Sequence, residues 1–111
     1  MIRFATRKDV AAIFQLIEEL ASFERAPEQV VNTPAQLEID LFDDQICSAI
    51  VATNPDNAVV GFALYYISYS TWKGRCVYLE DFYVLEAERK QGFGQALFDE
   101  VVRIAKDRGV K

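Results

Sequence analysis

The chain has 111 residues, of which 51% are hydrophobic and 26% are charged, and its formal net charge is -5. This length and composition predict a single folded domain and exclude a disordered chain. The excess of negative charge disfavours nucleic acid and an anionic membrane surface as partners, and it favours cationic small molecules. No apolar run is long enough to cross a bilayer and no signal peptide is recognisable, so we expect a cytoplasmic protein.

A metal site is not expected. The chain has no histidine, and its two cysteines, Cys47 and Cys76, lie in apolar runs without CxxC spacing. Cysteines of this kind are typical of buried thiols in a reducing compartment.

The N-terminal third predicts a strand followed by two helices. Residues 1–5 alternate as a strand does, and Thr6-Arg7-Lys8-Asp9 resembles a capping box. Apolar residues at helical spacing then predict a helix that ends near Phe23. A second start signal, Thr33-Pro34-Ala35-Gln36, predicts a short helix to about Asp43.

The middle of the chain predicts three strands. Residues 48–53 form the first, Asn54-Pro55-Asp56-Asn57 is a turn, and residues 58–69 continue as the second. A loop at residues 70–75 leads to the third strand, residues 76–84. These strands are expected to form hairpins.

The last segment predicts a helix with a glycine-containing start. Gly92-Phe93-Gly94 opens an amphipathic helix, and Gly109 is a plausible C-terminal stop. The predicted order is therefore strand, helix, helix, three strands, helix, which defines a mixed α/β domain over residues 1–111.

The junction at Arg89-Lys90-Gln91-Gly92-Phe93-Gly94 is the most informative segment. A helix start offers free N–H groups and a positive dipole end, glycine allows close approach, and Arg89 and Lys90 add positive charge. A pyrophosphate site and a plain tight turn between strand and helix are equally good interpretations of these residues alone. Neither a Walker A loop, which needs GK[ST], nor a dinucleotide fingerprint fits the segment.

Two adjacent acids, Glu80 and Asp81, interrupt the apolar third strand. A carboxylate in such a strand is costly unless it is paired, and neighbouring strand residues face opposite sides, so we expect only one of the two to point into a given pocket. A chain without histidine that deprotonates an amine must use a carboxylate, a tyrosine or water. The alternative is a solvated strand edge on which these acids pair with Lys73 or Arg75.

The R-x-x-G-x-G pattern of Arg89 to Gly94 after a long apolar strand resembles the signature of the GNAT N-acetyltransferases. The segments at residues 60–66, 70–75 and 78–84 resemble the diamine (spermidine/spermine) and thialysine N-acetyltransferase branch of that superfamily, and residues 17–24 and 28–30 are similar too. The resemblance implies the acyl-CoA N-acyltransferase fold, of which this chain would hold the N-terminal portion. It also implies acetyl-CoA as co-substrate, a small amine as acceptor and a homodimer.

The resemblance also assigns residues to acetyl-CoA. It implies that the strand offers backbone groups to the pantetheine arm and that the following loop wraps the pyrophosphate; the residues concerned are Phe82, Tyr83, Val84, Arg89, Lys90, Gln91, Gly92, Phe93, Gly94 and Gln95. In this branch glycine usually follows the arginine directly, whereas this chain has Lys90 there. We expect Lys90 to keep the anion site but to tilt the loop or raise its affinity.

For the acceptor, the resemblance implies Glu80 as the catalytic base and Asp81 as a group that holds the amine. Glu24 corresponds to a family acid that contacts the distal ammonium, and Trp72 could pack on the alkyl chain of the substrate or make a cation–π contact with it. Plain alternatives are a solvated charge at a helix end for Glu24 and a loop anchor for Trp72.

The implied reaction is direct attack of the amine on the thioester, with no acyl-enzyme on cysteine. In the family a tyrosine beyond the next strand supplies the proton to the leaving thiolate, and we expect this sequence to be a C-terminally truncated domain that stops before it. The alternatives are a module that binds acetyl-CoA without turnover and a structural fragment that associates through its exposed strands.

Overall fold

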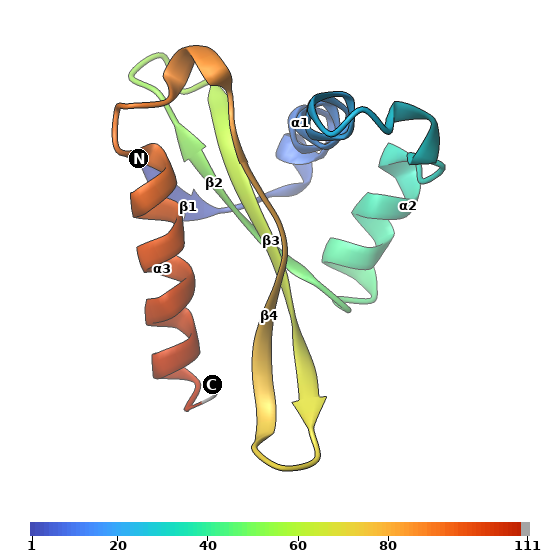
Figure 1. Ribbon diagram of the computed structural model, residues 1–111, viewed down its shortest axis with the longest axis vertical. Coiled ribbons are helices and arrows are strands. Elements are labelled where there is room, and N and C mark those ends of the chain that lie inside the picture. Colours follow the sequence, from blue (N-terminus) through green and yellow to red (C-terminus); the bar gives the residue numbers. More distant parts are fainter. Residues whose placement is uncertain (110–111) are drawn as a thin grey trace.

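The computed structural model describes residues 1–109 and shows a four-stranded antiparallel sheet with helices on both faces (Figure 1). The elements in chain order are β1 (Ile2–Phe4), α1 (Val10–Phe23), α2 (Pro34–Glu38), β2 (Ser48–Thr53), β3 (Val59–Ser70), β4 (Gly74–Val84) and α3 (Phe93–Asp107). The strands lie side by side in the order β1-β2-β3-β4. The predicted mixed α/β order is confirmed, although the last two residues of the predicted domain lie outside the described part.

The N-terminus of the first helix is held by Asp9, which is buried. The Asp9 carboxylate accepts hydrogen bonds from the Thr6 N–H at 2.7 Å and from the Arg3 guanidinium at 2.7 and 3.0 Å. A single 3-10 turn, Arg7–Asp9, precedes α1. The capping signal seen in the sequence is therefore used, and the same carboxylate also ties the helix start to β1.

The hairpin between β3 and β4 is longer than the sequence predicts. Strand β4 begins at Gly74 rather than Cys76, because Gly74 adopts φ +88° and Ser70 Oγ accepts hydrogen bonds from the N–H groups of Trp72 and Lys73. Pairing therefore continues to the end of the hairpin, which projects away from the helices (Figure 1).

The predicted second helix is also divided. Helix α2 covers Pro34–Glu38, and the chain continues as a π-helical turn at Ile39–Asp43. Thr33 caps α2 by accepting a hydrogen bond from the Gln36 N–H at 3.1 Å, as its position in the sequence predicts.

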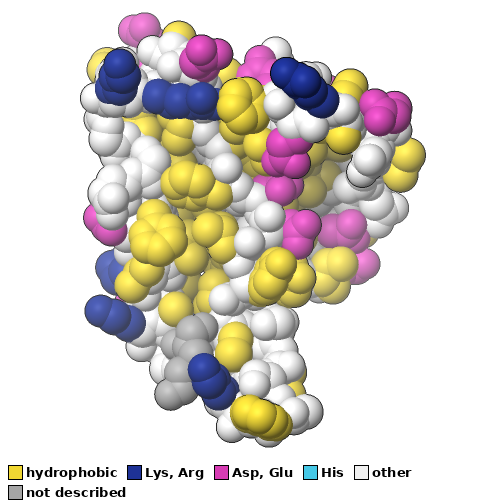
Figure 2. Space-filling view, viewed as in Figure 1, with side chains coloured by type: hydrophobic (Ala, Val, Ile, Leu, Met, Phe, Trp, Pro, Cys, Tyr) yellow, Lys and Arg dark blue, Asp and Glu magenta, His cyan; other side chains and the backbone are white. Residues whose placement is uncertain are grey.

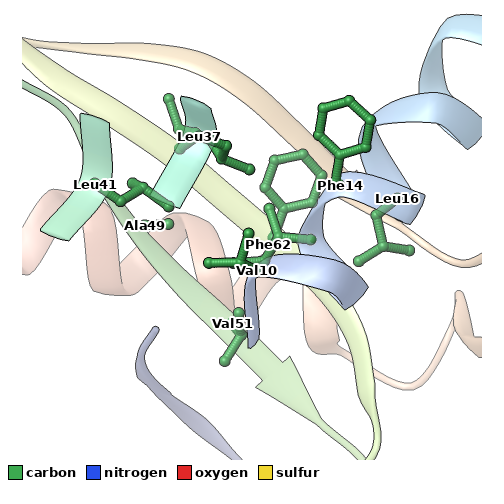
Figure 3. Close-up of a cluster of buried hydrophobic side chains, with 10 residues drawn as sticks. Val10, Phe14, Leu16, Leu37, Leu41, Ala49, Val51 and Phe62 are labelled. Atoms are coloured by element: carbon green, nitrogen blue, oxygen red, sulfur yellow. The ribbon is translucent and has the colours of Figure 1, made fainter. Parts of the chain in front are cut away.

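Two apolar clusters lie on opposite faces of the sheet. Figure 3 shows the cluster between the sheet and the helices α1 and α2, in which Phe14 and Leu37 pack over Val51 and Phe62. The other cluster lies between the sheet and α3, with Tyr65 and Leu97 among its fully buried members. The sheet is thus the wall that both cores share.

Gly61 allows β3, β4 and α3 to meet closely. A Cβ atom at this position would lie 3.0 Å from Val84 Cγ2, 3.1 Å from the Tyr83 carbonyl oxygen and 3.3 Å from Leu97 Cδ1. Most real Cβ contacts are longer than these, so a residue with a Cβ atom fits here only if its neighbours move by a few tenths of an ångström. This contact positions the end of β4 relative to α3, which is where the candidate site lies.

Candidate functional site

A groove of ≈500 Å³ opens where β4 ends and α3 begins. Its walls come from three parts of the chain, which are the end of β4, the last turn of α1, and the loop with the first turn of α3. The lining residues are Leu20, Phe23, Phe82, Tyr83, Val84, Arg89, Lys90, Gly92, Gly94 and Gln95. The structure therefore brings together all the residues predicted to bind acetyl-CoA except Gln91 and Phe93.

The start of α3 forms the polar end of this groove. No side chain caps the helix, and the first turn contains no acidic residue. The first hydrogen bond of the helix joins the Ala96 N–H to the Gly92 carbonyl oxygen at 3.0 Å, so the amides of residues 93–95 have no acceptor within the helix. Free amides at the positive end of a 15-residue helix form a suitable anion site.

The loop that leads into α3 has two residues with positive φ. Gly92 has φ +84°, and a Cβ atom there would meet nothing within 4 Å, so the space in front of the helix start is open. Lys90 has φ +76°, which is unusual for a residue with a side chain. The left-handed conformation explains why glycine would suit the position of Lys90.

Arg89 crosses one end of the groove. Its Nε donates a hydrogen bond to the Val84 carbonyl oxygen at 3.0 Å. The guanidinium lies over the rings of Phe23 and Tyr83, at 5.4 and 5.3 Å from their centroids. Arg89 thereby joins the end of α1 to the end of β4.

Gln91 and Phe93 have other roles. Gln91 is exposed, and its side-chain amide donates to the Glu88 carboxylate at 3.0 Å. Phe93 packs against the apolar cluster under α3. Their backbone can still contribute to the loop, but their side chains do not line the groove.

The acidic pair lies at a β-bulge. The pairing of β3 with β4 passes from Leu64↔Asp81 to Tyr65↔Leu79, so Glu80 is an extra residue without a partner. Leu79 packs on the α3 side whereas Tyr83 packs on the α1 side, although regular alternation would place both on one side. The sequence-based expectation that Glu80 and Asp81 face opposite sides assumes a regular strand, and regular alternation does not hold across this bulge.

Asp81 lies in an unneutralised acidic environment. Burial raises the pKa of Asp81, and the negative charges of Glu80 and Glu24 raise it further. Glu80 also acts on Tyr66, whose pKa is raised by burial first and then by Glu80 and Tyr78, and the Tyr66 and Tyr78 rings lie 5.2 Å apart. Helix α1 thus brings Glu24 to the same region as the two acids of β4.

These acids do not pair with the basic residues of the hairpin. Within the described part of the chain, neither Glu80 nor Asp81 forms an ion pair with Lys73, Arg75 or any other basic residue. The pairing that the alternative requires is therefore not seen, although β4 is an edge strand of the described sheet and Glu80 is exposed. An acidic site of this kind favours a cation.

Trp72 is not part of this assembly. It lies at the turn between β3 and β4 with 94% of its surface exposed, and it packs neither as a loop anchor nor against the groove. In Figure 1 this turn is far from the loop that precedes α3. A single chain therefore does not bring Trp72 to the other predicted substrate residues.

Two groove residues, Leu20 and Phe23, were missed from the sequence. Leu20 belongs to the apolar stripe of α1, a pattern that by itself indicates core packing, whereas Phe23 follows that stripe and is 64% exposed. An exposed phenylalanine at a helix end is a weak sign by itself. What ties Phe23 to the groove is the Arg89 guanidinium, which lies over its ring. The sequence does not reveal this contact.

Charge is distributed unevenly around the site. Figure 2 shows Lys and Arg side chains where the loop between β4 and α3 lies, and acidic side chains on the side of α1.

Over residues 1–109, no three His, Cys, Asp or Glu side chains come together in a way that could hold a metal ion. No described helix has the length and apolar character needed to span a membrane.

A helix start that can accept a phosphate, beside an acidic pair and on an antiparallel sheet with helices on both faces, is typical of an enzyme that brings a coenzyme to a cationic substrate. Comparison with known proteins gives the family. The profile of the acetyltransferase (GNAT) family matches residues 11–111. The chain belongs to the GNAT acetyltransferase family, and it is an acetyltransferase.

Curated relatives agree with this assignment, and solved structures share the fold. The chain is 40% identical to the thialysine N-epsilon-acetyltransferase of Bos taurus, over 98% of this chain and 69% of the relative. It is 36% identical to the spermidine/spermine N(1)-acetyltransferase-like protein 1 of Homo sapiens, over 94% of this chain and 16% of that protein. An acetyltransferase from Vibrio fischeri has the same fold, with a TM-score of 0.76 and 23% identity, over all of this chain and 90% of that one.

Proposed function

We propose that this protein transfers an acetyl group from acetyl-CoA to the primary amine of a small aminoalkyl substrate, such as thialysine, a lysine-like amino acid or a diamine. The observation that carries the proposal is the uncapped start of α3, which opens into a groove beside an unpaired acidic pair. The printed name of the Bos taurus relative supports a thialysine-like acceptor.

The proposed place of the co-substrate is the groove at the start of α3. The amides at the start of α3 and the charges of Arg89 and Lys90 would bind the pyrophosphate, and the open space in front of Gly92 leaves room for it. Backbone groups of Phe82, Tyr83 and Val84 would hold the pantetheine arm along β4. When bound, acetyl-CoA supplies the activated acetyl carbonyl.

The acidic residues would receive the amine. Glu24 and Asp81 would hold its positive charge, and Glu80 would take up the proton that the ammonium must lose before it can attack. The bulge that frees Glu80 from strand pairing also lets its side chain turn toward the same region. A neutral amine formed beside the groove could then attack the acetyl carbonyl directly.

Two further parts of the proposal come from family likeness. The proton for the departing thiolate would come from a tyrosine that is not among the tyrosines of residues 65–83, and the working protein would be a homodimer. Trp72 is left out of the single-chain site because of its position at the tip of the hairpin. We propose no metal and no nucleic-acid partner.

The test is thiol release from acetyl-CoA by the full-length protein with thialysine, lysine, a diamine and a polyamine. We expect amine-dependent release, and a loss of at least 10²-fold in kcat for Glu80→Gln, which is the usual contribution of a general base. Glu28→Gln, which changes an exposed glutamate outside the groove, is the matched control and should keep its activity. Thermal stabilisation by coenzyme A without any thiol release would show a binding module instead.

A further inference from the structure

Two tyrosines lie beside the acidic residues and have no role in the proposed transfer. Tyr66 of β3 and Tyr78 of β4 are direct cross-strand partners, and their rings lie 5.2 Å apart with an angle of 35° between their planes. Such a pair stabilises a hairpin by itself. Tyr78 nevertheless leaves 51% of its surface exposed, and neither tyrosine belongs to the apolar clusters of the described chain. The pair therefore presents an aromatic surface beside the site.

Both rings lie on the α1 side of the sheet. Leu64 belongs to the cluster under α1 and α2, whereas Tyr65 belongs to the cluster under α3. The extra residue of the bulge is in β4, so β3 alternates regularly and Tyr66 faces the same side as Leu64. The ring contact places Tyr78 on that side too. Asp81 is the cross-strand partner of Leu64, so its side chain shares this face with the tyrosines.

Three rows of side chains follow one another along this face of the hairpin. Tyr83, which lines the groove, is in the first row, Asp81 is in the second, and the tyrosine pair forms the third. Successive rows are two residues of β3 apart, or about 7 Å. Glu80 lies at the bulge between the second and third rows. An amine that reaches the groove beside these acids therefore extends the rest of its molecule toward the tyrosines.

The surroundings of the tyrosine pair favour a cation. Burial raises the pKa of Tyr66, and the charges of Glu80 and Tyr78 raise it further, with no basic residue among the causes. The face of an aromatic ring is itself electron-rich and attracts a cation. Rings next to an unpaired carboxylate thus suit a positively charged alkyl group better than a neutral one.

We propose that Tyr66 and Tyr78 are specificity-determining residues whose rings bind the far end of the acceptor, where a second ammonium group is located. This inference rests on the proposed function, because it takes the amine beside the groove as the reacting one. The second ammonium lies over the exposed ring of Tyr78, and the alkyl chain crosses from the acids to the rings. The pair therefore favours acceptors with two amines over monoamines of the same length.

The test compares 1,4-diaminobutane with butylamine as acceptors for the full-length protein. Wild type should prefer the diamine in kcat/KM, after correction for its two equivalent amines. Tyr78→Leu should raise the diamine KM by roughly 3- to 30-fold, as expected for a lost cation–π contact, and should leave kcat and the butylamine KM nearly unchanged. Tyr78→Phe keeps the ring and should keep the preference. The matched control is Phe4→Leu, which removes a ring that is 56% exposed from the opposite edge of the sheet.

Calorimetric titration with 1,4-diaminobutane separates this inference from the proposed function. Diamine binding that Tyr78→Leu loses and Tyr78→Phe keeps would support the aromatic site even if no thiol were released, a result that refutes acetyl transfer alone. Acetyl transfer with the same diamine KM in Tyr78→Leu as in wild type would overturn the inference and leave the transfer intact. An equal loss for both amines would reduce the pair to a structural contact and overturn it too. If Tyr78→Leu does not fold, Tyr66→Leu replaces it.

Discussion

Asp9 shows how one carboxylate links a helix start to a strand. Its hydrogen bond from Arg3 lowers the pKa of Asp9, burial opposes this, and the bonds from Thr6 lower the pKa further. A lowered pKa means that the stabilisation is present at neutral pH and is lost as the pH falls through the folded-state value. The local structure of α1 therefore depends on an ionised Asp9.

We predict that Asp9→Asn lowers the free energy of unfolding by about 1.5–3 kcal/mol at pH 7, the usual range for a hydrogen bond to a charged group. The difference from wild type should shrink as the pH falls below about 4, where the Asp9 carboxyl of the unfolded chain takes up its proton, and vanish below the lowered folded-state value. Urea unfolding at several pH values measures both effects. Asp56→Asn, in the exposed turn between β2 and β3, is the control and should change stability little.

Lys90 has a backbone conformation that suits glycine. A left-handed conformation costs a residue with a side chain roughly 1–2 kcal/mol, and the gain from Lys90→Gly is reduced by the extra freedom of glycine in the unfolded chain. We predict that Lys90→Gly stabilises the fold by at most about 1 kcal/mol. It should also weaken coenzyme A binding, more at low salt than at high salt, because a positive charge is lost.

Lys90→Asn tests the two effects separately. Asparagine tolerates positive φ better than lysine does but carries no charge. It should weaken coenzyme A binding as Lys90→Gly does, whereas Lys90→Arg should keep both the affinity and the strain. Equal affinity of all three variants would show that the charge at position 90 does not contact the ligand.

The pKa of Asp81 is shifted in the opposite direction to that of Asp9, so its contribution to stability has the opposite dependence on pH. Its pKa is raised by burial and by Glu80 and Glu24, so its contribution to stability is present at low pH and is lost as the pH rises through the folded-state value. We predict that Asp81→Asn is more stable than wild type at pH 7, and that the advantage disappears below about pH 4. Activity toward amines should fall in the same variant. An unchanged or lower stability at pH 7 would contradict the acidic environment described here.

At the scale of elements, the position of β4 against α3 depends on Gly61. We predict that Gly61→Ala lowers the free energy of unfolding by about 1–3 kcal/mol, because the added methyl group overpacks a closed contact. The shift of the Tyr83 carbonyl should also weaken coenzyme A binding. Chemical unfolding and calorimetric titration measure the two effects.

Gly94 provides the matched control. A Cβ atom there would come no closer than 3.6 Å, to Phe82 Cζ, which is ordinary contact. Gly94→Ala should therefore be tolerated and should gain some of the roughly 0.5–1 kcal/mol by which alanine exceeds glycine in a helix. A loss of stability as large as that of Gly61→Ala would mean that the packing argument is wrong.

The sequence predicts the elements better than it predicts their irregularities. Helices α1 and α3 follow from apolar residues at helical spacing, and the turn and cap residues mark where the elements begin and end. The bulge at Glu80 does not follow from the sequence, because it arises from the register between β3 and β4.

In the candidate site, too, the sequence predicts what is local along the chain and not what depends on tertiary packing. Its loop residues are neighbours along the chain, so the sequence can place them together, and the resemblance to a family adds their roles. Phe23 reaches the groove only because α1 packs across the sheet, and Trp72 misses it because the hairpin is long. Contacts between distant segments depend on tertiary packing, which local patterns do not record.

At the scale of the whole molecule, one side chain bridges two layers at the groove. The sheet separates the cluster under α1 and α2 from the cluster under α3. Arg89 makes such a link, since it bonds to Val84 at the end of β4 and its guanidinium lies over Phe23 at the end of α1. The Val84 carbonyl oxygen has a second lone pair, so it could still accept a hydrogen bond from the pantetheine arm in the proposed function.

We predict that Arg89→Lys loosens the end of α1 while it keeps the charge of the loop. Lysine lacks the Nε hydrogen bond and the planar group over the rings, a loss of about 1–2 kcal/mol. Hydrogen exchange should therefore become faster at the amides of Glu24, Arg25 and Ala26, which close the last turns of α1. Arg103→Lys, on the exposed face of α3, is the control and should leave these amides unchanged; unchanged exchange in Arg89→Lys as well would mean that Arg89 does not hold the two layers together.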